Sequence, residues 1–353
     1  MSSEVTGFSP SDASGLVSCI CVTQPGRLAL VQRAVLNFME QDYPNRELIL
    51  MVKDEGYAEQ VRTFLSLTLS DLTERARPSI SLRTHSFSSA KEAIIQGMAY
   101  ARGEWICIWD DDNLSHPSRI ESQLRYTPEG SASALTKSLY FFYESSELFV
   151  SGFEQPGGSP SERCAVSSLM FSRRAYPGFD IANQRQAKDS FAVNFVDRAR
   201  GAMTLLPHLP YMFITCVHED NARGAEFHRR AASGLPTTRS RDWILDNEVG
   251  LAEALDQYQW PASDVHVSGK DAQAFTYVPE KRWPQLLEEV TVPEPAAVEA
   301  EEVGHSCPKG EPGEMGEPGD ATDRDQFETQ IAGALQEAVV LKNSEGSSSG
   351  QED

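Results

Sequence analysis

The sequence predicts an α/β protein with a Rossmann-like, mostly parallel central sheet flanked by helices. Short apolar runs typical of strands alternate with segments of helical periodicity over residues 15–109. These runs are continuous rather than alternating apolar and polar, as expected for strands buried on both faces of a parallel sheet. Turn-forming stretches such as "QPGR", "YPN" and "KDEG" separate the segments. Together these observations favour a sheet with helices on both faces.

The first four strands of this sheet follow one another with helices between them. We expect strands at residues 15–23, in "ELILMV", in "SISLRTHSF" and in "EWICIW". A helix is expected after the first strand, because apolar residues recur there at helical spacing, and another over residues 57–72. The third, "SSAKEAIIQGMAYARG", has a serine N-cap and ends just before Gly103.

The pattern is less regular after Asn113. "HPSRIESQLRY" and "AKDSFAVNFVDRAR" predict helices, "SLYFFY" and "SELFVSGF" predict an antiparallel pair, and "AVSSLMFSRRAY" and "YMFITCVH" predict two further strands. "RDWILDNEVGLAEALDQYQ" predicts one amphipathic helix that counts Val249 among its apolar residues. We therefore expect residues 226–290 to form a C-terminal helical extension.

The net charge of −21 is concentrated at the C-terminal end. Residues 291–353 hold 15 Asp and Glu against 3 Lys and Arg, which leaves about −9 for residues 1–290. This balance argues against nucleic-acid binding, which needs a basic surface. We expect residues 1–14 to be flexible and residues 291–353 to form a disordered, acidic, low-complexity tail. Its three Gly-X-Y triplets, "GEPGEMGEP", are too few for a collagen helix.

Cysteine usage and hydropathy predict a cytoplasmic protein. The six cysteines form no C-x-x-C pair and mostly lie in apolar runs, which favours reduced thiols in a core. Cys19 and Cys21 are expected on one face of a strand. The N-terminal residues lack the basic and apolar regions of a secretory signal, and no apolar run reaches the ~18–20 residues of a transmembrane segment.

The stretch "DDDN" at residues 110–113 is the strongest chemical signal. Asp110 and Asp112 are two residues apart at a strand end, so their side chains are expected on one side and that of Asp111 on the other. Two carboxylates suit a hard divalent cation such as Mg²⁺ or Mn²⁺, and the alternative is a solvated acidic turn. Because "TQPG", "KDEG" and "DDDN" all follow strands, we expect them to meet at one edge of the sheet.

The segments "VSCICVT", "RLALVQRAVLNFMEQDYPNRELILMV" and "ARGEWICIWDDDN" resemble, in this order, family 2 glycosyltransferases of the GT-A fold. The resemblance covers about residues 15–225. It implies a nucleotide-sugar-binding half at residues 15–118 and an acceptor half at residues 119–225. It also implies transfer of a sugar from a nucleotide-diphosphate sugar, with Mn²⁺ or Mg²⁺ on the diphosphate.

By this resemblance, Asp112 binds the metal directly, Asp110 lies near it or near the donor ribose, and His218 completes the metal site. Asp189 is the expected base on the acceptor hydroxyl, although Lys188 stands where the family usually has Glu. The alternatives are an ordinary acid at the start of a helix for Asp189 and a structural role for His218.

The remaining expected site residues would contact the donor. Asp54 occupies the place where the family hydrogen-bonds a uracil-like base, and Thr23, Gln24 and Pro25 would line the same pocket. Lys91 resembles a basic residue that some members direct at the donor, and a solvated helix position is the alternative.

The resemblance therefore implies a metal-dependent, inverting, hexosyltransferase-type enzyme. A UDP-sugar is the expected donor, and the acceptor is a hydroxyl of a glycan, a lipid-linked sugar or a protein. Two other functions stay open. A nucleotidyltransferase also uses acidic metal ligands, but "TQPGRLAL" is only a faint version of its Gly-rich loop. A non-catalytic GT-A-like scaffold could bind partners through the acidic tail.

Overall fold

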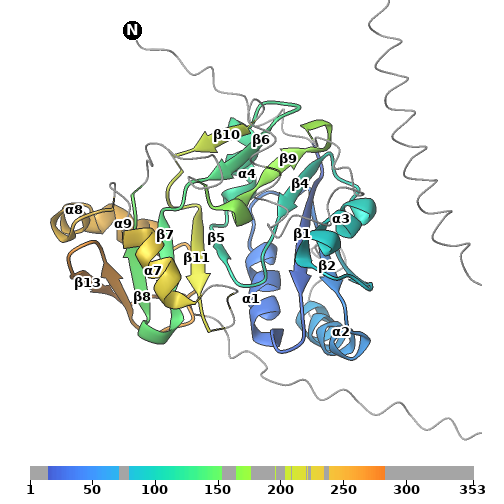
Figure 1. Cartoon of the computed structure of the whole chain (residues 1–353), viewed down its shortest axis with the longest axis horizontal. Helices are drawn as coiled ribbons and strands as arrows, with labels where there is room; N and C mark the ends of the chain where they lie inside the picture. The colour runs from blue at the N-terminus through green and yellow to red at the C-terminus, as the bar shows by residue number, and fades with distance from the viewer. Residues whose placement is uncertain are drawn as a thin grey trace, which may run out of the picture. The chain divides into compact units, whose positions relative to one another are not determined.

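The computed structural model describes residues 15–70, 79–152, 164–175, 195, 203–207, 209–219, 221, 224–233 and 238–282 (Figure 1). All of them belong to the first of two units, residues 1–294 and 295–353, into which the chain divides. The expected flexible N-terminus (residues 1–14) and acidic tail (residues 291–353) lie outside the described residues.

The first sheet confirms the prediction of an α/β protein with a mostly parallel sheet. Its strand order is β10-β6-β9-β4-β1-β2-β3. The strands β3, β2, β1 and β4 are mutually parallel, and β9 runs antiparallel between β4 and β6. The bounds are β1 Val17–Thr23, β2 Arg46–Val52, β3 Ser79–Thr84, β4 Trp105–Ile108, β6 Ala132–Leu135, β9 Met170–Ser172 and β10 Met203–Leu206.

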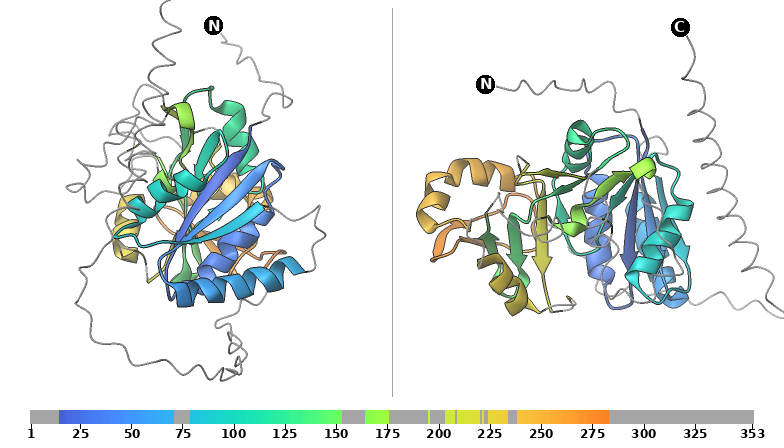
Figure 2. Two further views of the ribbon diagram at one scale, coloured as in Figure 1. Left: turned by 90° about the vertical axis from the view of Figure 1, so that its right-hand side faces the viewer. Right: turned by 45° about the horizontal axis from the view of Figure 1, so that its top comes forward.

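Helices cover both faces of this sheet, and the alternation of side chains along the strands explains how. Cys19 and Cys21 of β1 pack on one face with α1 (Leu28–Met39), α2 (Glu55–Ser70) and α4 (Arg119–Tyr126). Ile20 of the same strand packs on the other face with α3 (Ala90–Tyr100). The right-hand view of Figure 2 shows α1 and α3 on opposite sides of the strands. The five described cysteines are buried free thiols, and Cys307 lies outside the described residues.

The helix α3 begins and packs as its sequence predicts. The Ser89 side chain accepts a hydrogen bond from the Glu92 backbone N–H, which makes Ser89 the N-cap. A Cβ atom added at Gly97 would lie 2.7 Å from the Ile20 Cγ2 atom of β1. The glycine therefore lets α3 approach the sheet closely, and this brings its first turn to the carboxyl ends of β1 and β4.

A second sheet, of order β13-β12-β8-β7-β11-β5, adjoins the end of β4. The predicted antiparallel pair is confirmed as β7 and β8. The strand β5 follows "DDDN" directly and pairs with β11, so His218 at the end of β11 comes close to the aspartates. The bounds are β5 Leu114–Ser115, β7 Leu139–Phe142, β8 Glu147–Val150, β11 Phe213–Val217, β12 Val265–Ser268 and β13 Gln273–Tyr277.

The expectation that residues 226–290 form a helical extension is wrong in part. Three helices, α7 Ala225–Ser233, α8 Arg241–Asp246 and α9 Glu248–Leu255, lead into β12 and β13. The strand β12 pairs with β8, more than 100 residues earlier, and such a distant partner leaves no signal in the local sequence. The single helix predicted over residues 241–259 is interrupted at Asn247, and its predicted apolar member Val249 is 73% exposed.

Short 3₁₀ turns connect several of these elements: η2 Tyr143–Ser145, η3 Val166–Ser168 and η4 Arg173–Ala175. Among the described residues, no helix combines the length and the apolar character needed to cross a membrane.

Candidate functional site

A cavity of about 360 Å³ lies at the carboxyl ends of β1, β2 and β4, next to the first turn of α3. Its polar lining comes from Thr23 at the end of β1, Gln24 and Arg27 after it, Lys53 after β2, Ser88 and Ser89 before α3, and Asp110, Asp111 and Asp112 after β4. The strands β1 and β4 are hydrogen-bonded neighbours and run parallel, which is why their following loops meet here. The convergence predicted for "TQPG" and "DDDN" is confirmed, and the second strand contributes Lys53.

The three aspartates are held by contacts on both sides of the segment. Just before them, the indole Nε1 of Trp109 donates to the Ala34 carbonyl of α1 (3.1 Å). Just after them, Asn113 donates to Asp110 Oδ2 (2.9 Å) and accepts from the backbone N–H of Cys216 in β11 (2.9 Å). The acidic segment is therefore tied to α1 and to the second sheet, and its geometry is not that of a freely solvated turn.

The turn that follows β1 places Arg27 at this segment. The Arg27 backbone N–H donates to the Gln24 carbonyl (3.2 Å), which closes a four-residue turn. Pro25 and Gly26 occupy its two central positions, and Gly26 has a φ of +85°, as a type II turn requires at its third residue. The helix α1 begins at the next residue, Leu28, so the turn and the helix together fix where the Arg27 side chain starts.

The guanidinium of Arg27 bridges two of the three aspartates. Its Nη1 lies 2.9 Å from Asp111 Oδ1, and its Nη2 lies 2.6 Å from Asp112 Oδ2. The side chains of Arg27, Asp111 and Asp112 are 16%, 2% and 13% exposed. The prediction that Asp111 points away from the site is wrong. Asp111 follows the end of β4, so the alternation of an extended strand no longer applies, and its buried carboxylate pairs with Arg27.

The end of β11 contributes two more groups to Asp112. The His218 Nε2 lies 3.2 Å from Asp112 Oδ2 and 3.2 Å from Arg27 Nη2. The Asn221 amide lies 3.4 Å from the same Asp112 oxygen, and its Oδ1 accepts from the His218 backbone N–H (2.6 Å). His218 and Asp112, which the resemblance places together, are therefore brought together, and Asn221 fixes the backbone that carries the histidine.

The three carboxyl groups have different acidities because their partners differ. Burial and the charge of Asp112 raise the pKa of Asp110 and of Asp111. Burial also acts to raise the pKa of Asp112, but the hydrogen bonds and charges of His218 and Arg27 outweigh it, so this pKa is lowered. Asp112 is therefore the carboxylate that stays ionised most readily.

Two buried polar atoms of this site have no hydrogen-bond partner in the described part of the chain. They are the Nε of Arg27 and the Oδ2 of Asp111. A buried N–H or carboxyl oxygen without a partner is costly, and natural sites with this feature usually bind a ligand, an ion or water there. The Arg27–Asp111 pair therefore has hydrogen-bonding capacity that the described residues leave unused.

The arrangement does not fit the divalent cation that the resemblance implies. Carboxylate oxygens are suitable ligands for Mn²⁺ or Mg²⁺. In the described part of the chain, however, no three side chains of His, Cys, Asp and Glu are arranged so that they could hold a metal ion. The guanidinium of Arg27 contacts Asp112 and His218, two of the three expected metal ligands, so a cation already belongs to the site. The role of Asp110, Asp112 and His218 as metal ligands stays a prediction.

The other predicted donor contacts are only partly brought together. Thr23 and Gln24 line the cavity, and the buried Thr23 hydroxyl lies 3.1 Å from the Tyr57 hydroxyl. Pro25, Asp54 and Lys91 are not among the described residues that line it. The Asp54 carboxylate instead accepts from the Tyr57 backbone N–H (2.7 Å) at the start of α2, as a helix-capping residue does. Asp189 and Lys188 lie outside the described residues.

Sequence reasoning missed Arg27 and Lys53 as site residues, and it misplaced Asp111. The available signal was positional, because each of the two basic residues stands in a loop that directly follows a predicted parallel strand. The prediction considered the acidic residues and the residues of the family motifs, and it did not consider these two basic residues.

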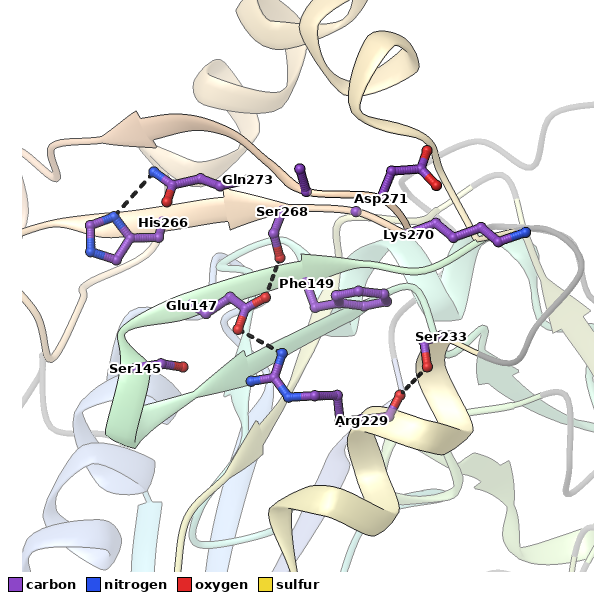
Figure 3. A pocket seen from close by; sticks show the side chains of 12 residues that line it. Ser145, Glu147, Phe149, Arg229, Ser233, His266, Ser268, Lys270, Asp271 and Gln273 are labelled. Carbon is purple, nitrogen blue, oxygen red and sulfur yellow. Dashed lines mark hydrogen bonds and ion pairs between the residues drawn. The ribbon is translucent and has the colours of Figure 1, made fainter.

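A second cavity, of about 450 Å³, lies on the second sheet beside α7 (Figure 3). Its polar groups largely pair with one another. Arg229 of α7 lies 2.7 Å from Glu147 of β8, and Ser268 of β12 donates to the same carboxylate. No lining side chain of this cavity is among the described buried atoms that lack a hydrogen-bond partner. The described buried polar atoms of its lining have partners, whereas one such atom of Arg27 and one of Asp111 do not, so the cavity at the ends of β1 and β4 is the better candidate.

Comparisons with known proteins give one family match. Residues 19–154 match the model of glycosyl transferase family 2. A search among curated proteins found no match to the chain.

Several solved structures are similar to the chain at low identity. One is the mannosyltransferase PcManGT from Pyrobaculum calidifontis in complex with GDP-Man and Mn²⁺, with 15% identity over 69% of this chain and 64% of that one and a TM-score of 0.43. Another is S. aureus TarS, with 12% identity over 69% of this chain and 42% of that one and a TM-score of 0.41. TarS 1–349 with UDP-GlcNAc has 10% identity over 68% and 66%, with a TM-score of 0.41.

The chain thus spans less than two thirds of the length of the first two of these structures. The family match itself includes the turn with Arg27, the loop with Lys53 and the acidic segment after β4. Over residues 19–154, the chain therefore carries the sequence pattern of glycosyl transferase family 2, as the resemblance of its motifs predicted.

Proposed function

We propose that this protein is a glycosyltransferase that transfers a sugar from a nucleotide-diphosphate sugar to an acceptor hydroxyl. One observation carries the proposal. The segment that matches glycosyl transferase family 2, residues 19–154, supplies all the described residues that line the cavity at the ends of β1, β2 and β4. The family match and a cavity lined by Arg27 and Asp111, two residues with unsatisfied buried polar atoms, thus coincide.

The lining suits the donor. A volume of about 360 Å³ falls within the range of small-molecule sites. Ile20, Val22 and Phe87 offer apolar surface to a base and ribose, and Thr23 and Gln24 offer hydrogen-bonding groups. Departure of a nucleoside diphosphate builds negative charge on its phosphate oxygens, so positive groups nearby lower the barrier. Arg27 and Lys53 are the cationic residues among those that line the cavity.

The finer features stay proposals. Inversion requires a base on the acceptor side, opposite the leaving group, and Asp189 is proposed for that role. Asp54 as a contact of the base, Lys91 as a donor contact, a UDP-sugar as the donor and a hexosyl group as the unit transferred stay predictions. Mn²⁺ or Mg²⁺ as the cofactor is implied by the resemblance alone. A glycan, lipid-linked or protein acceptor and a cytoplasmic location are proposed on sequence grounds alone.

Ligand-dependent thermal stability tests the donor class. Purified full-length protein is heated with UDP-, GDP- and dTDP-sugars, each with Mn²⁺ and with EDTA. A ligand at 100 times its Kd stabilises the folded state by about 2.7 kcal/mol, which raises Tm by several degrees. A rise with one class of nucleotide sugar supports the proposal and identifies the donor. The absence of any rise with all of them would instead favour the non-catalytic scaffold.

The base is tested with Asp189→Asn. We expect hydrolysis or transfer of the identified donor to fall at least 100-fold, as removal of a general base does, while the donor-dependent rise in Tm is kept. Asp197→Asn, from the same predicted helix, is the control and should keep its activity. Equal rates for wild type and Asp189→Asn would refute this assignment of the base. Release of pyrophosphate from a nucleoside triphosphate and a sugar phosphate would identify a nucleotidyltransferase instead.

A further inference from the structure

We propose that Arg27 is the resident cation of this site: its guanidinium takes the place of a divalent metal at Asp112 and binds the diphosphate of the nucleotide sugar. The inference rests on the proposed function, because that function supplies the diphosphate. It goes beyond it by naming the group that binds the diphosphate and by predicting that nucleotide binding needs no Mn²⁺ or Mg²⁺.

The first argument is position. The Nη2 of Arg27 lies 2.6 Å from Asp112 Oδ2 and 3.2 Å from His218 Nε2. These are the atoms that would bind a metal if Asp112 and His218 were its ligands. Arg27 follows β1 and Asp112 follows β4, both strands of the first sheet, whereas His218 follows β11 of the second sheet. The guanidinium therefore connects the ends of these three strands.

The second argument is that the guanidinium is secured. Its Nη1 pairs with Asp111 Oδ1 at 2.9 Å, and the Asp111 side chain is only 2% exposed. One buried carboxylate and one largely buried carboxylate, each on its own nitrogen, hold the plane of the guanidinium as a bidentate arrangement does. Removing such a buried partner would leave an uncompensated charge, so exchange of Arg27 for a metal ion would require Asp111 to find a new partner.

The third argument is that Arg27 has donor capacity left. An arginine carries five N–H donors, and the contacts to Asp111 and Asp112 involve one nitrogen each, Nη1 and Nη2, so further Nη–H donors remain. The residue also lines the cavity. The planar donors of arginine match phosphate oxygens, so the Nη–H groups that do not contact Asp111 or Asp112 can bind the diphosphate while those two contacts are kept. Lys53, on the wall of the same cavity, adds a second positive charge.

Nucleotide titration with and without metal tests the proposal. UDP, GDP and dTDP are titrated into the full chain by calorimetry, first in EDTA and then with Mn²⁺. We expect one of them to bind the wild type in EDTA with a Kd that Mn²⁺ changes less than threefold. Arg27→Gln should weaken this binding at least tenfold, and Arg27→Lys should weaken it less. Arg62→Gln, an exposed ion-paired arginine of α2, is the control and should bind like the wild type.

A second measurement does not depend on the nucleotide. Binding of Mn²⁺ alone is followed by electron paramagnetic resonance. The wild type should bind no Mn²⁺ at 100 μM, because Arg27 occupies the carboxylates. Arg27→Gln should gain a Mn²⁺ site, and Arg27→Gln with Asp112→Asn should lose it. Circular dichroism of each variant establishes that it is folded, and Arg27→Met, which also removes the charge, replaces Arg27→Gln if Arg27→Gln does not fold.

The results separate the two levels of inference. A wild type that binds nucleotide only with Mn²⁺, or an Arg27→Gln variant that binds as tightly as the wild type in EDTA, would overturn the role of Arg27 and leave the glycosyltransferase proposal intact. No binding of any nucleotide in either condition would overturn the proposed function and the diphosphate role. The Mn²⁺ measurement would then still decide whether Arg27 takes the metal's place.

Discussion

At the scale of single residues, the interior of this protein contains charged groups, and each has defined partners. Arg27 is paired with Asp111 and Asp112 at the candidate site. Arg119 is 1% exposed and donates to Ser115, to the Ile108 carbonyl and to Gln123. Buried charges of this kind are stable only when paired or hydrogen-bonded, so they define one arrangement of the chain around them.

Glu47 allows a prediction about pH. Its side chain is 5% exposed and accepts from the Ser18 hydroxyl (2.6 Å) and from the backbone N–H and Nε of Arg102 (2.8 and 2.7 Å). Burial acts to raise its pKa, but these hydrogen bonds outweigh it, so the pKa lies below its ordinary value of 4.5. A carboxylate with a lowered folded-state pKa stabilises the protein above the unfolded-state pKa and loses that effect as pH falls through the folded-state value.

We therefore expect Glu47→Gln to lower the free energy of unfolding by about 1–2 kcal/mol at pH 7, since charge-assisted hydrogen bonds are lost. The difference from wild type should shrink below about pH 4.5, as the wild-type carboxylate takes up a proton. Urea denaturation at a series of pH values measures it. Glu121→Gln, an exposed partner of Arg125 on α4, should change stability by less than about 0.5 kcal/mol at every pH. A pH-independent difference for Glu47→Gln would contradict the prediction.

At the scale of elements, the site depends on a turn, a strand end and a helix that meet because β1 and β4 are parallel neighbours. The turn Gln24–Arg27 connects β1 to α1. The side chain of its fourth residue, Arg27, pairs with Asp111 of the acidic segment. The Asn37 side chain of the same helix forms two hydrogen bonds with the backbone of Ser115 in β5. It donates to the Ser115 carbonyl and accepts from the Ser115 N–H, both at 2.7 Å. The helix α1 therefore aligns both ends of the "DDDN" segment.

Gly26 provides a test of the turn. It has a φ of +85°, and nothing lies within 4 Å of a Cβ added there, so Gly26→Ala acts through backbone strain alone. Gly130 has the same properties, with a φ of +71°, but lies in the turn between α4 and β6. Each alanine should destabilise the protein by about 1 kcal/mol in thermal unfolding.

Only Gly26→Ala should weaken nucleotide binding, by an expected factor of three or more in calorimetry, because only that turn positions Arg27. Equal affinities of the two variants for the nucleotide would show that the turn does not control the site.

At the scale of the whole described unit, the segment between β4 and β5 links the two sheets, and the second sheet includes elements distant in sequence. Trp260, which follows α9, packs its ring against Phe141, Tyr258 and Tyr277, with centroids 5.4, 6.0 and 6.1 Å away. Its indole N–H donates to the Leu255 carbonyl (3.0 Å). Trp260 thus joins β7, β13 and the end of α9, which is why residues 226–282 are part of this unit rather than an appendage.

Trp260→Ala should therefore lower the free energy of unfolding by about 3–5 kcal/mol, the usual cost of removing a fully buried tryptophan. Val249→Ala, at a position that is 73% exposed on α9, should change it by less than about 0.5 kcal/mol. Urea denaturation followed by circular dichroism measures both. A small effect of Trp260→Ala would mean that β12 and β13 are not coupled to the rest of the second sheet.

The sequence by itself determined the features that depend on nearby residues. Strand-forming runs, helical periodicity, the Ser89 cap and the family motifs all have a local signature, and each predicted the first sheet or its acidic edge correctly. Asp112 and His218 were placed together on the strength of their order in a known motif.

Only the tertiary structure decided which charges meet. Arg27 and Asp112 are 85 residues apart, β12 finds β8 across more than 100, and nothing in the local sequence specifies either pairing. The orientation of Asp111 likewise follows from the end of β4 and the arrival of Arg27, not from strand alternation. Energies of burial and charge pairing depend on all the neighbours at once. The strand pattern therefore predicts where the site lies. Which cationic group pairs with its aspartates is decided only when the two sheets come together.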